Sequence, residues 1–469
     1  MRTKKLRKRN RWGISLLISV MMVASLIPMT AFADGNDKAI QMGTAVLATN
    51  VNESTAATVY YGKNPFSDPR DELCAWRVIG YGTNGMQTTA STTSTMTLFA
   101  SDNMYSCHFN LPSSENNRYS GSSLKTIVDT IAENLTAKEQ AAVVKRTLKT
   151  GEYRGDEPYC DGIAGDPVTD ALLWPLSTAE ASSTNSELKN VSRYWWLRSP
   201  GDTNTKAAFV DSNGIVARQG AEVNSTGYCV RPAFNLNLNS VLFTSAATDG
   251  KASGTVGATT LTAVGTNSGN EWKLTLIDST RSNFKATSTT RTGDTLTVSY
   301  EGATTGTNEY ISAIVKDSSD DIKYYGRIKA LSADGSTTGG TVDIDLSRIT
   351  LATGDTLNIF NEQYNGDKQT DYASELNAVT VPIKYEITEG AYGQWTKGSM
   401  TTLDFKANAD YSKFSDVGSV SVDETMLDYS NYTSEIGSTV IKLNTAYLES
   451  LSVGQHTLRI DFTDGFAET

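Results

Sequence analysis

Histidine is almost absent from this sequence, which has only His108 and His456 among its 469 residues. Enzymes use histidine more often than any other side chain for acid and base catalysis, and zinc sites are commonly built from several histidines. The two histidines lie in different predicted domains, so a Ser-His-Asp or Cys-His triad is hard to assemble. The sequence also lacks a glycine-rich phosphate loop and an Asp-x-Asp-x-Asp-Gly calcium loop. We therefore expect no catalytic residue, no metal site and no cofactor.

Cysteine is scarce as well, and its four copies are Cys74, Cys107, Cys160 and Cys229. In an oxidising compartment they can form two disulfides in three possible pairings, and the alternative is four reduced thiols in a protein core. The sequence leaves both states open.

Acidic residues are missing from the first 33 positions, which hold seven Lys and Arg residues followed by the apolar stretch ISLLISVMMVASLIPMTAFA. A basic start, an apolar centre and a final Ala-Phe-Ala are the parts of a secretion signal, so we predict cleavage before Asp34. The alternative is a membrane anchor, because the stretch approaches the roughly 20 residues of a spanning helix. No later segment is apolar enough to span, so we expect an extracellular protein, secreted or attached to the cell wall, with no membrane span after cleavage.

Positive charge is in deficit once this leader is removed. The remaining chain has 34 Lys and Arg against 52 Asp and Glu, a net charge of −18. Such a surface repels nucleic acid and anionic lipid, so we expect neither as a partner.

Strong helix formers are also few, while Thr, Ser, Gly, Asn and Tyr are common, as in β-rich extracellular modules. About 435 residues are too many for one core. We predict a multidomain protein with an α+β head followed by two all-β immunoglobulin-like sandwiches. The predicted boundaries are 1–33 for the signal, 34–239 for the head, 240–383 for the first sandwich and 384–469 for the second.

In the predicted head, the β-branched and aromatic content of residues 74–82 and 95–101 predicts two strands. The apolar spacing of Leu124 to Leu135 predicts a helix. The sequence Thr136 to Glu139 is a capping box that predicts a second helix through AAVVKRTL, and Ser177 to Glu180 is another capping box. Asp211-Ser212-Asn213-Gly214, between two apolar runs, predicts a hairpin turn.

Beyond Asn239 the sequence predicts short strands about ten residues apart, among them TTLTAVG, EWKLTLI and TLTVSYEG, which is typical of antiparallel sandwiches. The chain stops at Phe466-Ala467-Glu468-Thr469, directly after a turn. A closing strand should follow there, so we expect either that the sequence is a fragment or that the last domain is incomplete.

The most distinctive cluster is Tyr194 to Gly201, which contains Trp195, Trp196 and Arg198. Alternation along a strand places one tryptophan in the core and the other on the opposite face, where an aromatic ring beside polar groups can stack on a sugar. Asp211, Asn213 and Arg231 complete the predicted ligand-binding set. The alternative is that both tryptophans are packed in the core and that Arg198 and Arg231 form buried ion pairs.

Acidic residues gather between Gly155 and Asp170, where the candidates for a two-carboxylate glycosidase are Asp156, Glu157, Asp161, Asp166 and Asp170. A solvated acidic loop or a weak calcium site is the alternative.

Five segments in order, AWRVIGYG, LLWPLSTAEA, YWWLRSPG, AAFVDSNGIV and CVRPAFNL, resemble an uncharacterised domain family common in exported proteins of Gram-positive gut bacteria. That family looks like the C-type-lectin-like fold of formylglycine-generating enzymes, in which a Trp-rich strand and a terminal Val-Arg strand frame the ligand face. The reactive cysteine motif of those enzymes has no match around Cys229. The resemblance implies a fold and a ligand face, and no catalytic residue.

The segment from Tyr385 to Gly465 resembles an immunoglobulin-like module of clostridial cellulose-associated scaffold and surface proteins, which implies binding of polysaccharide or cell wall. We therefore expect a non-catalytic binding protein whose partner is a polysaccharide, a glycoprotein or a cell wall. An extracellular carbohydrate-active hydrolase and a purely structural surface spacer are the alternatives.

Overall fold

The computed structural model describes residues 38–69, 72–82, 94–111, 116–148, 167–251, 256–415, 418–436 and 438–469. The predicted signal, Cys160 and four of the candidate acidic residues (Asp156, Glu157, Asp161 and Asp166) lie outside these ranges. Within them, no helix combines the length and the apolar character needed to cross a bilayer.

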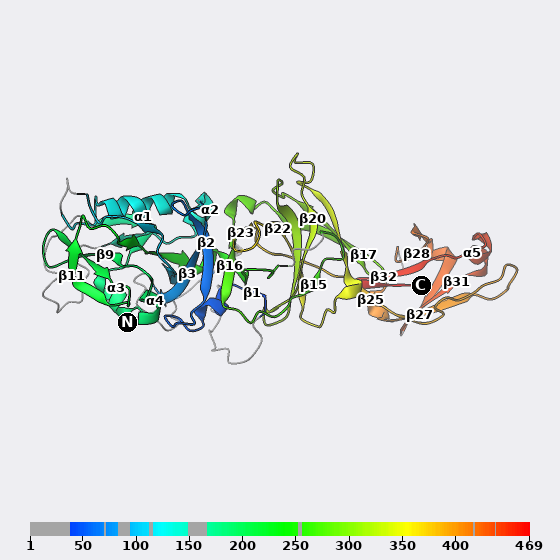
Figure 1. Ribbon diagram of the computed structural model, residues 1–469. Helices are drawn as coiled ribbons and strands as arrows, with labels where there is room; N and C mark the ends of the chain where they lie inside the picture. Colours follow the sequence, from blue (N-terminus) through cyan, green and yellow to red (C-terminus); the bar gives the residue numbers. More distant parts are fainter. Residues whose placement is uncertain are drawn as a thin grey trace, which may run out of the picture. The chain divides into compact units, whose positions relative to one another are not determined.

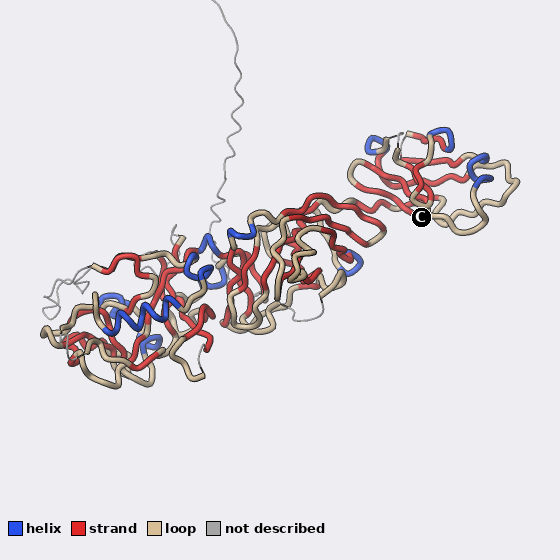
Figure 2. The backbone as a smooth tube through the Cα atoms, turned by 90° about the horizontal axis from the view of Figure 1, so that it is seen from above, coloured by secondary structure: helices blue, strands red, loops and turns tan. Residues whose placement is uncertain are grey.

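The described chain is mainly β structure, in several sheets with a few short helices (Figures 1 and 2). This confirms a β-rich multidomain protein. The helices are α1 (Ser123–Glu133), α2 (Ala137–Ala141), α3 (Thr178–Ser183), α4 (Ser186–Lys189) and α5 (Thr445–Ser450).

Helix α1 buries the predicted apolar face, with Leu124, Val128 and Ile131 in the core. Both capping boxes are present, at the start of α2 and of α3. The predicted length of α2 is wrong, because the helix ends at Ala141 and the chain turns into a strand at Arg146. Val143 instead forms a bridge with Leu236, which explains why these β-branched residues do not continue the helix.

The largest sheet combines strands from the first 250 residues with strands from beyond residue 260. In spatial order its main path is β15 (Thr262–Ala263), β20 (Ile322–Ala330), β19 (Glu309–Lys316), β22 (Thr356–Gln363), β23 (Asp371–Ala373), β16 (Glu271–Ile277), β2 (Thr58–Asn64), β3 (Glu72–Tyr81), β4 (Thr95–Ala100), β13 (Pro232–Asn237) and β8 (Trp174–Pro175). Beside this path lie β1 (Ile40–Met42), β14 (Val241–Ala246) and β24 (Asn377–Val379).

The pairing of β2 with β16 joins the two halves of this sheet. It is parallel, with Trp272 opposite Val59. Trp272 is 2% exposed and belongs to the same hydrophobic core as Trp76 and Phe234. Ile40, from the start of the described chain, packs in a separate core with Phe243 and Phe360. The predicted boundary after Asn239 therefore falls inside a shared sheet.

A second sheet packs against α3 and contains the Trp-rich strand. Its order is β11 (Val216–Glu222), β10 (Lys206–Val210), β9 (Trp195–Pro200), β12 (Cys229–Val230) and β5 (Tyr105–Ser106). The predicted hairpin is confirmed between β10 and β11. Gly214 has a φ of 77° in its turn, and a Cβ there would lie 2.8 Å from the carbonyl oxygen of Ser186, so only glycine fits.

Two further cores follow along the chain. One lies between β19, β20 and β22 and a sheet formed by β17 (Lys285–Thr292), β18 (Thr295–Glu301) and β21 (Gly340–Asp345). The other lies between two sheets of the last 90 or so residues. The first of these has β25 (Ile383–Tyr385), β33 (Gly465–Glu468), β32 (Leu458–Phe462), β28 (Val420–Val422) and β29 (Thr425–Met426), and the second has β26 (Ile387–Glu389), β27 (Leu403–Asp410), β31 (Ser438–Leu443) and β30 (Tyr432–Glu435).

The prediction that the final residues lack a closing strand is wrong. Residues Gly465–Glu468 form β33, which pairs with β32 and, in parallel, with β25. Phe466 is fully buried there.

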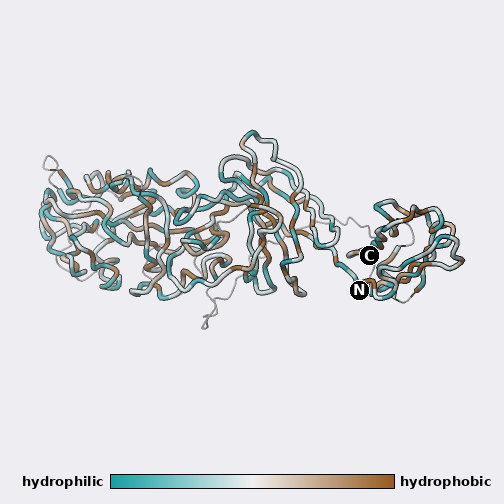
Figure 3. Tube along the Cα trace, turned by 45° about the vertical axis from the view of Figure 1, so that its right-hand side comes forward, coloured by the Kyte–Doolittle hydropathy of each residue, from teal (hydrophilic) through white to brown (hydrophobic). Residues whose placement is uncertain are grey.

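Hydropathy alternates along many of the strands, as expected where one face is buried (Figure 3).

Because Trp272 packs into the core that it shares with Trp76, we expect Trp272→Ala to lower the free energy of unfolding of the first core by about 3–5 kcal/mol. Urea denaturation followed by circular dichroism measures this loss. Trp395→Ala, at a partly buried residue that packs against the last core, is the control and should leave that transition in place. A wild-type first transition in the Trp272 variant would show that β16 is not part of the first core.

Candidate functional site

The two tryptophans of β9 are both fully buried. Trp195 packs at 5.4 Å from Phe99, and its indole Nε1 donates to the carbonyl of Lys189 at 3.3 Å. Trp196 stacks on Tyr228 at 4.2 Å, and its Nε1 donates to the carbonyl of Cys107 at 3.0 Å. The prediction that one tryptophan faces solvent is wrong, because structure covers both faces of β9.

Arg198 forms a buried ion pair with Glu180, whose other oxygen binds Arg146; both N–O distances are 2.5 Å. Burial alone would raise the pKa of Glu180, but the charges of Arg198 and Arg146 outweigh it and hold that pKa below its ordinary value. Glu180 also closes the capping box of α3 by accepting the N–H of Ser177. Arg198 therefore fixes a helix start.

Arg231 is fully buried and donates to backbone carbonyls. The acceptors are those of Ala100 at 2.7 Å, Leu188 at 3.0 Å, Ser101 at 3.1 Å and Lys189 at 3.2 Å. Burial lowers its pKa to about 9. These contacts join β4 to α4. Arg231 thus has no surface to offer a ligand, and its guanidinium binds carbonyls rather than the carboxylate of the alternative interpretation.

Asp211 and Asn213 lie in the β10–β11 turn. The Asp211 carboxylate accepts the N–H groups of Asn213 and Ile215 at 2.9 and 2.8 Å, so it stabilises the turn. Asn213 is exposed. The six predicted ligand residues do not converge on one accessible surface.

Cys74, Cys107 and Cys229 are free thiols. Burial, with smaller effects of nearby groups, raises the pKa of Cys74 and of Cys107 to about 12, so both are protonated at neutral pH and poor nucleophiles. Asp170 is the one described member of the acidic loop candidates; it is exposed, with a φ of 56°. Among the described residues no group of three or more His, Cys, Asp or Glu side chains is placed to hold a metal ion.

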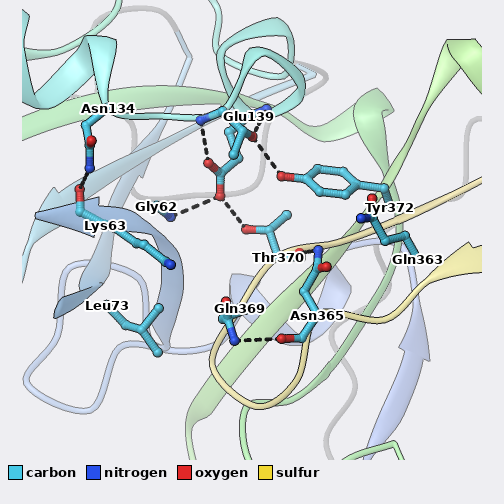
Figure 4. A pocket seen from close by; sticks show the side chains of 11 residues that line it. Gly62, Lys63, Leu73, Asn134, Glu139, Gln363, Asn365, Gln369, Thr370 and Tyr372 are labelled. Carbon is cyan, nitrogen blue, oxygen red and sulfur yellow. Dashed lines mark hydrogen bonds between the residues drawn. The ribbon is translucent and has the colours of Figure 1, made fainter. Parts of the chain in front are cut away.

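A cavity of about 300 Å³ lies where the first core meets the segment before β23. Figure 4 shows Lys63 and Leu73 on one side and Asn365 and Gln369 on the other. The full lining is Gly62, Lys63, Leu73, Asn134, Thr136, Glu139, Gln363, Asn365, Gln369, Thr370 and Tyr372. Most of these side chains are neutral amides or hydroxyls.

Glu139 holds the walls of this cavity together. Its Oε1 accepts the N–H of Gly62 at 3.2 Å and the hydroxyl of Thr370 at 2.9 Å, and its Oε2 accepts the N–H of Thr136 at 2.9 Å. Gly62 has a φ of 69°, and a Cβ there would lie 2.3 Å from the Leu135 side chain. The wall therefore needs glycine at that position.

The rest of the lining is arranged by short polar contacts. The hydroxyls of Tyr372 and Thr136 lie 2.7 Å apart, and Lys138 sits 4.6 Å from the centre of the Tyr372 ring. Gln369 donates to the carbonyl of Asn365 at 2.6 Å, and Asn365 donates to that of Thr370 at 2.7 Å. The amides are thus held in place by their own loop and present polar atoms to the cavity. Such a surface can exchange hydrogen bonds with hydroxyl groups.

Residues 95–238 match the model of a family described as a domain of unknown function (DUF6273). The head therefore contains an uncharacterised domain. This confirms the expectation of an uncharacterised domain in this part of the chain and assigns no activity. No curated protein matches the sequence.

Among solved structures, the chain is similar to the b-glucuronidase from Ruminococcus gnavus in complex with N1-substituted uronic isofagomine. That match has 14% identity, a TM-score of 0.14, and coverage of 51% of this chain and 46% of that chain. The same enzyme with D-glucuronic acid gives 14% identity, a TM-score of 0.12 and the same coverage. The match spans less than half of that enzyme, and scores this low carry no argument about fold or function.

Sequence reasoning missed the cavity. The capping box identified Glu139, but the partners of its carboxylate, Gly62 and Thr370, are distant in sequence. No local pattern marks Gln363 to Tyr372 as a wall.

The buried Glu180 gives a pH-dependent prediction. A lowered folded-state pKa means that its stabilisation is fully present above the unfolded carboxyl value of about 4.3 and is lost as the pH falls through the folded value. We expect Glu180→Gln to cost about 3–5 kcal/mol at neutral pH, because Arg146 and Arg198 stay buried without their partner. Urea denaturation between pH 7 and 3 should show the difference from wild type shrinking with acid. Glu301→Gln, in an exposed ion pair with Lys285, is the control and should change little. A pH-independent difference would contradict the assigned role.

Proposed function

We propose that this protein is a secreted or cell-surface, non-catalytic binding protein, and that the cavity around Glu139 binds a neutral, hydroxyl-rich group of a polysaccharide, glycoprotein or cell wall. The observation that carries the proposal is the lining of the cavity, where amides and hydroxyls outnumber charged groups. Neutral sugars offer hydroxyls that both donate and accept, and amide side chains match both roles.

The lining favours binding over hydrolysis. A glycosidase uses two carboxyl groups that flank the bond it cleaves. Among the residues lining the cavity, Glu139 is the one carboxylate, and its oxygens already accept three hydrogen bonds. A carboxylate engaged in this way is poorly placed to attack or protonate a sugar.

We propose further that the head has a C-type-lectin-like fold, and that the two modules that follow are immunoglobulin-like and hold the head away from the surface. The basic and apolar leader supports export from the cytoplasm. The net charge of −18 in the rest of the chain supports a soluble extracellular protein. The predicted ligand face at Trp195 and Trp196 is replaced by the Glu139 cavity, because both tryptophans are buried.

We expect residues 34–469 to bind at least one of insoluble polysaccharides, mucin and bacterial cell walls in a saturable pull-down. The double variant Lys63→Ala, Gln369→Ala removes two lining side chains and should weaken that binding about tenfold or more, or about 1.4 kcal/mol. Tyr392→Ala is the matched control, because Tyr392 is a 90% exposed aromatic residue of the last module.

Circular dichroism establishes that each variant is folded. Binding lost in the Tyr392 variant and kept in the double variant would move recognition to the last module. Release of sugar by the wild type would support the hydrolase instead, and binding to none of the surfaces would leave a spacer.

A further inference from the structure

Four charged side chains meet in the interior near the start of β23. Lys251 Nζ lies 2.5 Å from Glu362 Oε1 and 2.6 Å from Asp371 Oδ2, and Lys273 Nζ lies 2.8 Å from the same Asp371 oxygen. The exposed fractions of the four side chains are between 0% and 2%. Two ammonium groups and two carboxylates are thus removed from water together.

The surroundings of Lys251 are apolar and aromatic on one side. Its Nζ is 4.7 Å from the centre of the Phe243 ring and 5.9 Å from that of Tyr325, and it also donates to the hydroxyl of Thr275 at 2.7 Å. Burying an ammonium and a carboxylate is costly even when they are paired. Joining them as a neutral amide removes both charges, and a dry interior disfavours the reverse reaction with water.

We propose that Lys251 and Asp371 form an intramolecular amide bond, with Glu362 as the acid and base of the reaction. Lys251 passes a proton to Glu362 Oε1, and its neutral Nζ attacks Cγ of Asp371. The Nζ–Cγ bond forms and the Cγ–Oδ2 bond breaks. The second Nζ proton and the proton held by Glu362 leave with Oδ2 as one water molecule. The ammonium and the carboxylate therefore become an amide and water, with no oxidant or other reactant.

The hydrogen bonds assign the roles. Asp371 Oδ1 accepts the backbone N–H of Asn365 at 2.8 Å, which can stabilise the negative charge that develops there during attack. Lys273 lies against Oδ2, the oxygen that leaves, and its Nζ also donates to the carbonyl of Gly366 at 2.5 Å and lies 4.5 Å from the centre of the Tyr364 ring. Lys251 is the nucleophile because it alone of the two lysines touches both carboxylates.

Glu362 is fixed as the proton carrier rather than the acyl group. Its Oε2 accepts the hydroxyls of Ser312 and Tyr325, each at 2.7 Å, while Oε1 faces Lys251. Burial lowers the pKa of Lys251, but the charges of Asp371 and Glu362 outweigh it and raise that pKa. The amine therefore reacts only after a neighbour takes its proton, and Glu362 is in contact to do so.

The bond would connect residues 120 positions apart. It would join the chain just beyond β14 to the first residue of β23, and so close a covalent loop around most of the second module. A cross-link of this kind restricts the unfolded chain and resists its extension. The inference is independent of the proposed function, since it requires no ligand.

Intact mass spectrometry of denatured, reduced residues 34–469 tests the bond. We expect a mass lower than the sequence mass by one water molecule, and proteolysis should give a branched peptide in which Lys251 is joined to Asp371. Glu362→Gln keeps both reacting residues and should give the full mass with unlinked peptides. Lys285 and Glu301, an exposed ion pair at 2.8 Å, serve as an internal control and should appear in unlinked peptides.

The wild-type measurement needs no variant, so a failure of Glu362→Gln to fold leaves the test intact. A wild-type mass equal to the sequence mass, or a water loss mapped to other residues, would overturn the proposal. Where the variant folds, its thermal midpoint should be lower than that of wild type. Sugar binding in the pull-down is a separate readout, so either proposal can fail alone.

Discussion

The buried carboxylate of Glu139 ties together three segments that are distant in the sequence. It closes the capping box of α2, accepts the backbone N–H of Gly62 in β2, and accepts the hydroxyl of Thr370 before β23. The hydroxyl of Tyr61 adds a bond to its carbonyl at 2.6 Å. The start of a helix, the bend of a strand and the wall of the cavity therefore depend on one side chain. Removing it would leave several buried donors without an acceptor, which is more costly than the loss of an exposed pair.

Glu180 repeats this arrangement at α3. There too a capping-box glutamate is buried, and two arginines neutralise its charge. In both cases a local helix signal also serves a long-range contact. This economy suits a chain with few strong helix formers, because a short helix gains stability mainly from its caps and its packing.

Local rules recovered the local structure. The capping boxes, the turn at Gly214 and several strands follow from spacing and turn chemistry, and the predicted strand EWKLTLI coincides with β16. Strand β17, KATSTTRT, was not predicted from the sequence, because its residues are largely exposed and polar. It is held by pairing with β18 rather than by an apolar face. Period-two spacing signals a strand only where burial makes the two faces differ.

The predicted site failed for a related reason. The alternation of side chains along a strand correctly predicts that Trp195 and Trp196 point to opposite faces of β9. It does not predict which residues cover each face. Phe99 covers one face and Tyr228 the other. The Glu139 cavity and the Lys251 cluster depend on contacts between residues 77, 120 and 231 positions apart, which no local pattern encodes.

The segment from Glu362 to Tyr372 connects the two proposals. Glu362 and Asp371 turn into the interior toward Lys251, while Thr370 and Tyr372, the neighbours of Asp371, line the cavity. Alternation along the chain thus places the reacting carboxylate and the cavity wall on opposite sides of the same backbone. An amide at Asp371 would hold that backbone by a covalent bond directly behind the wall. Rigid walls reduce the ordering cost of binding, so the cross-link would also preorganise the cavity for its ligand.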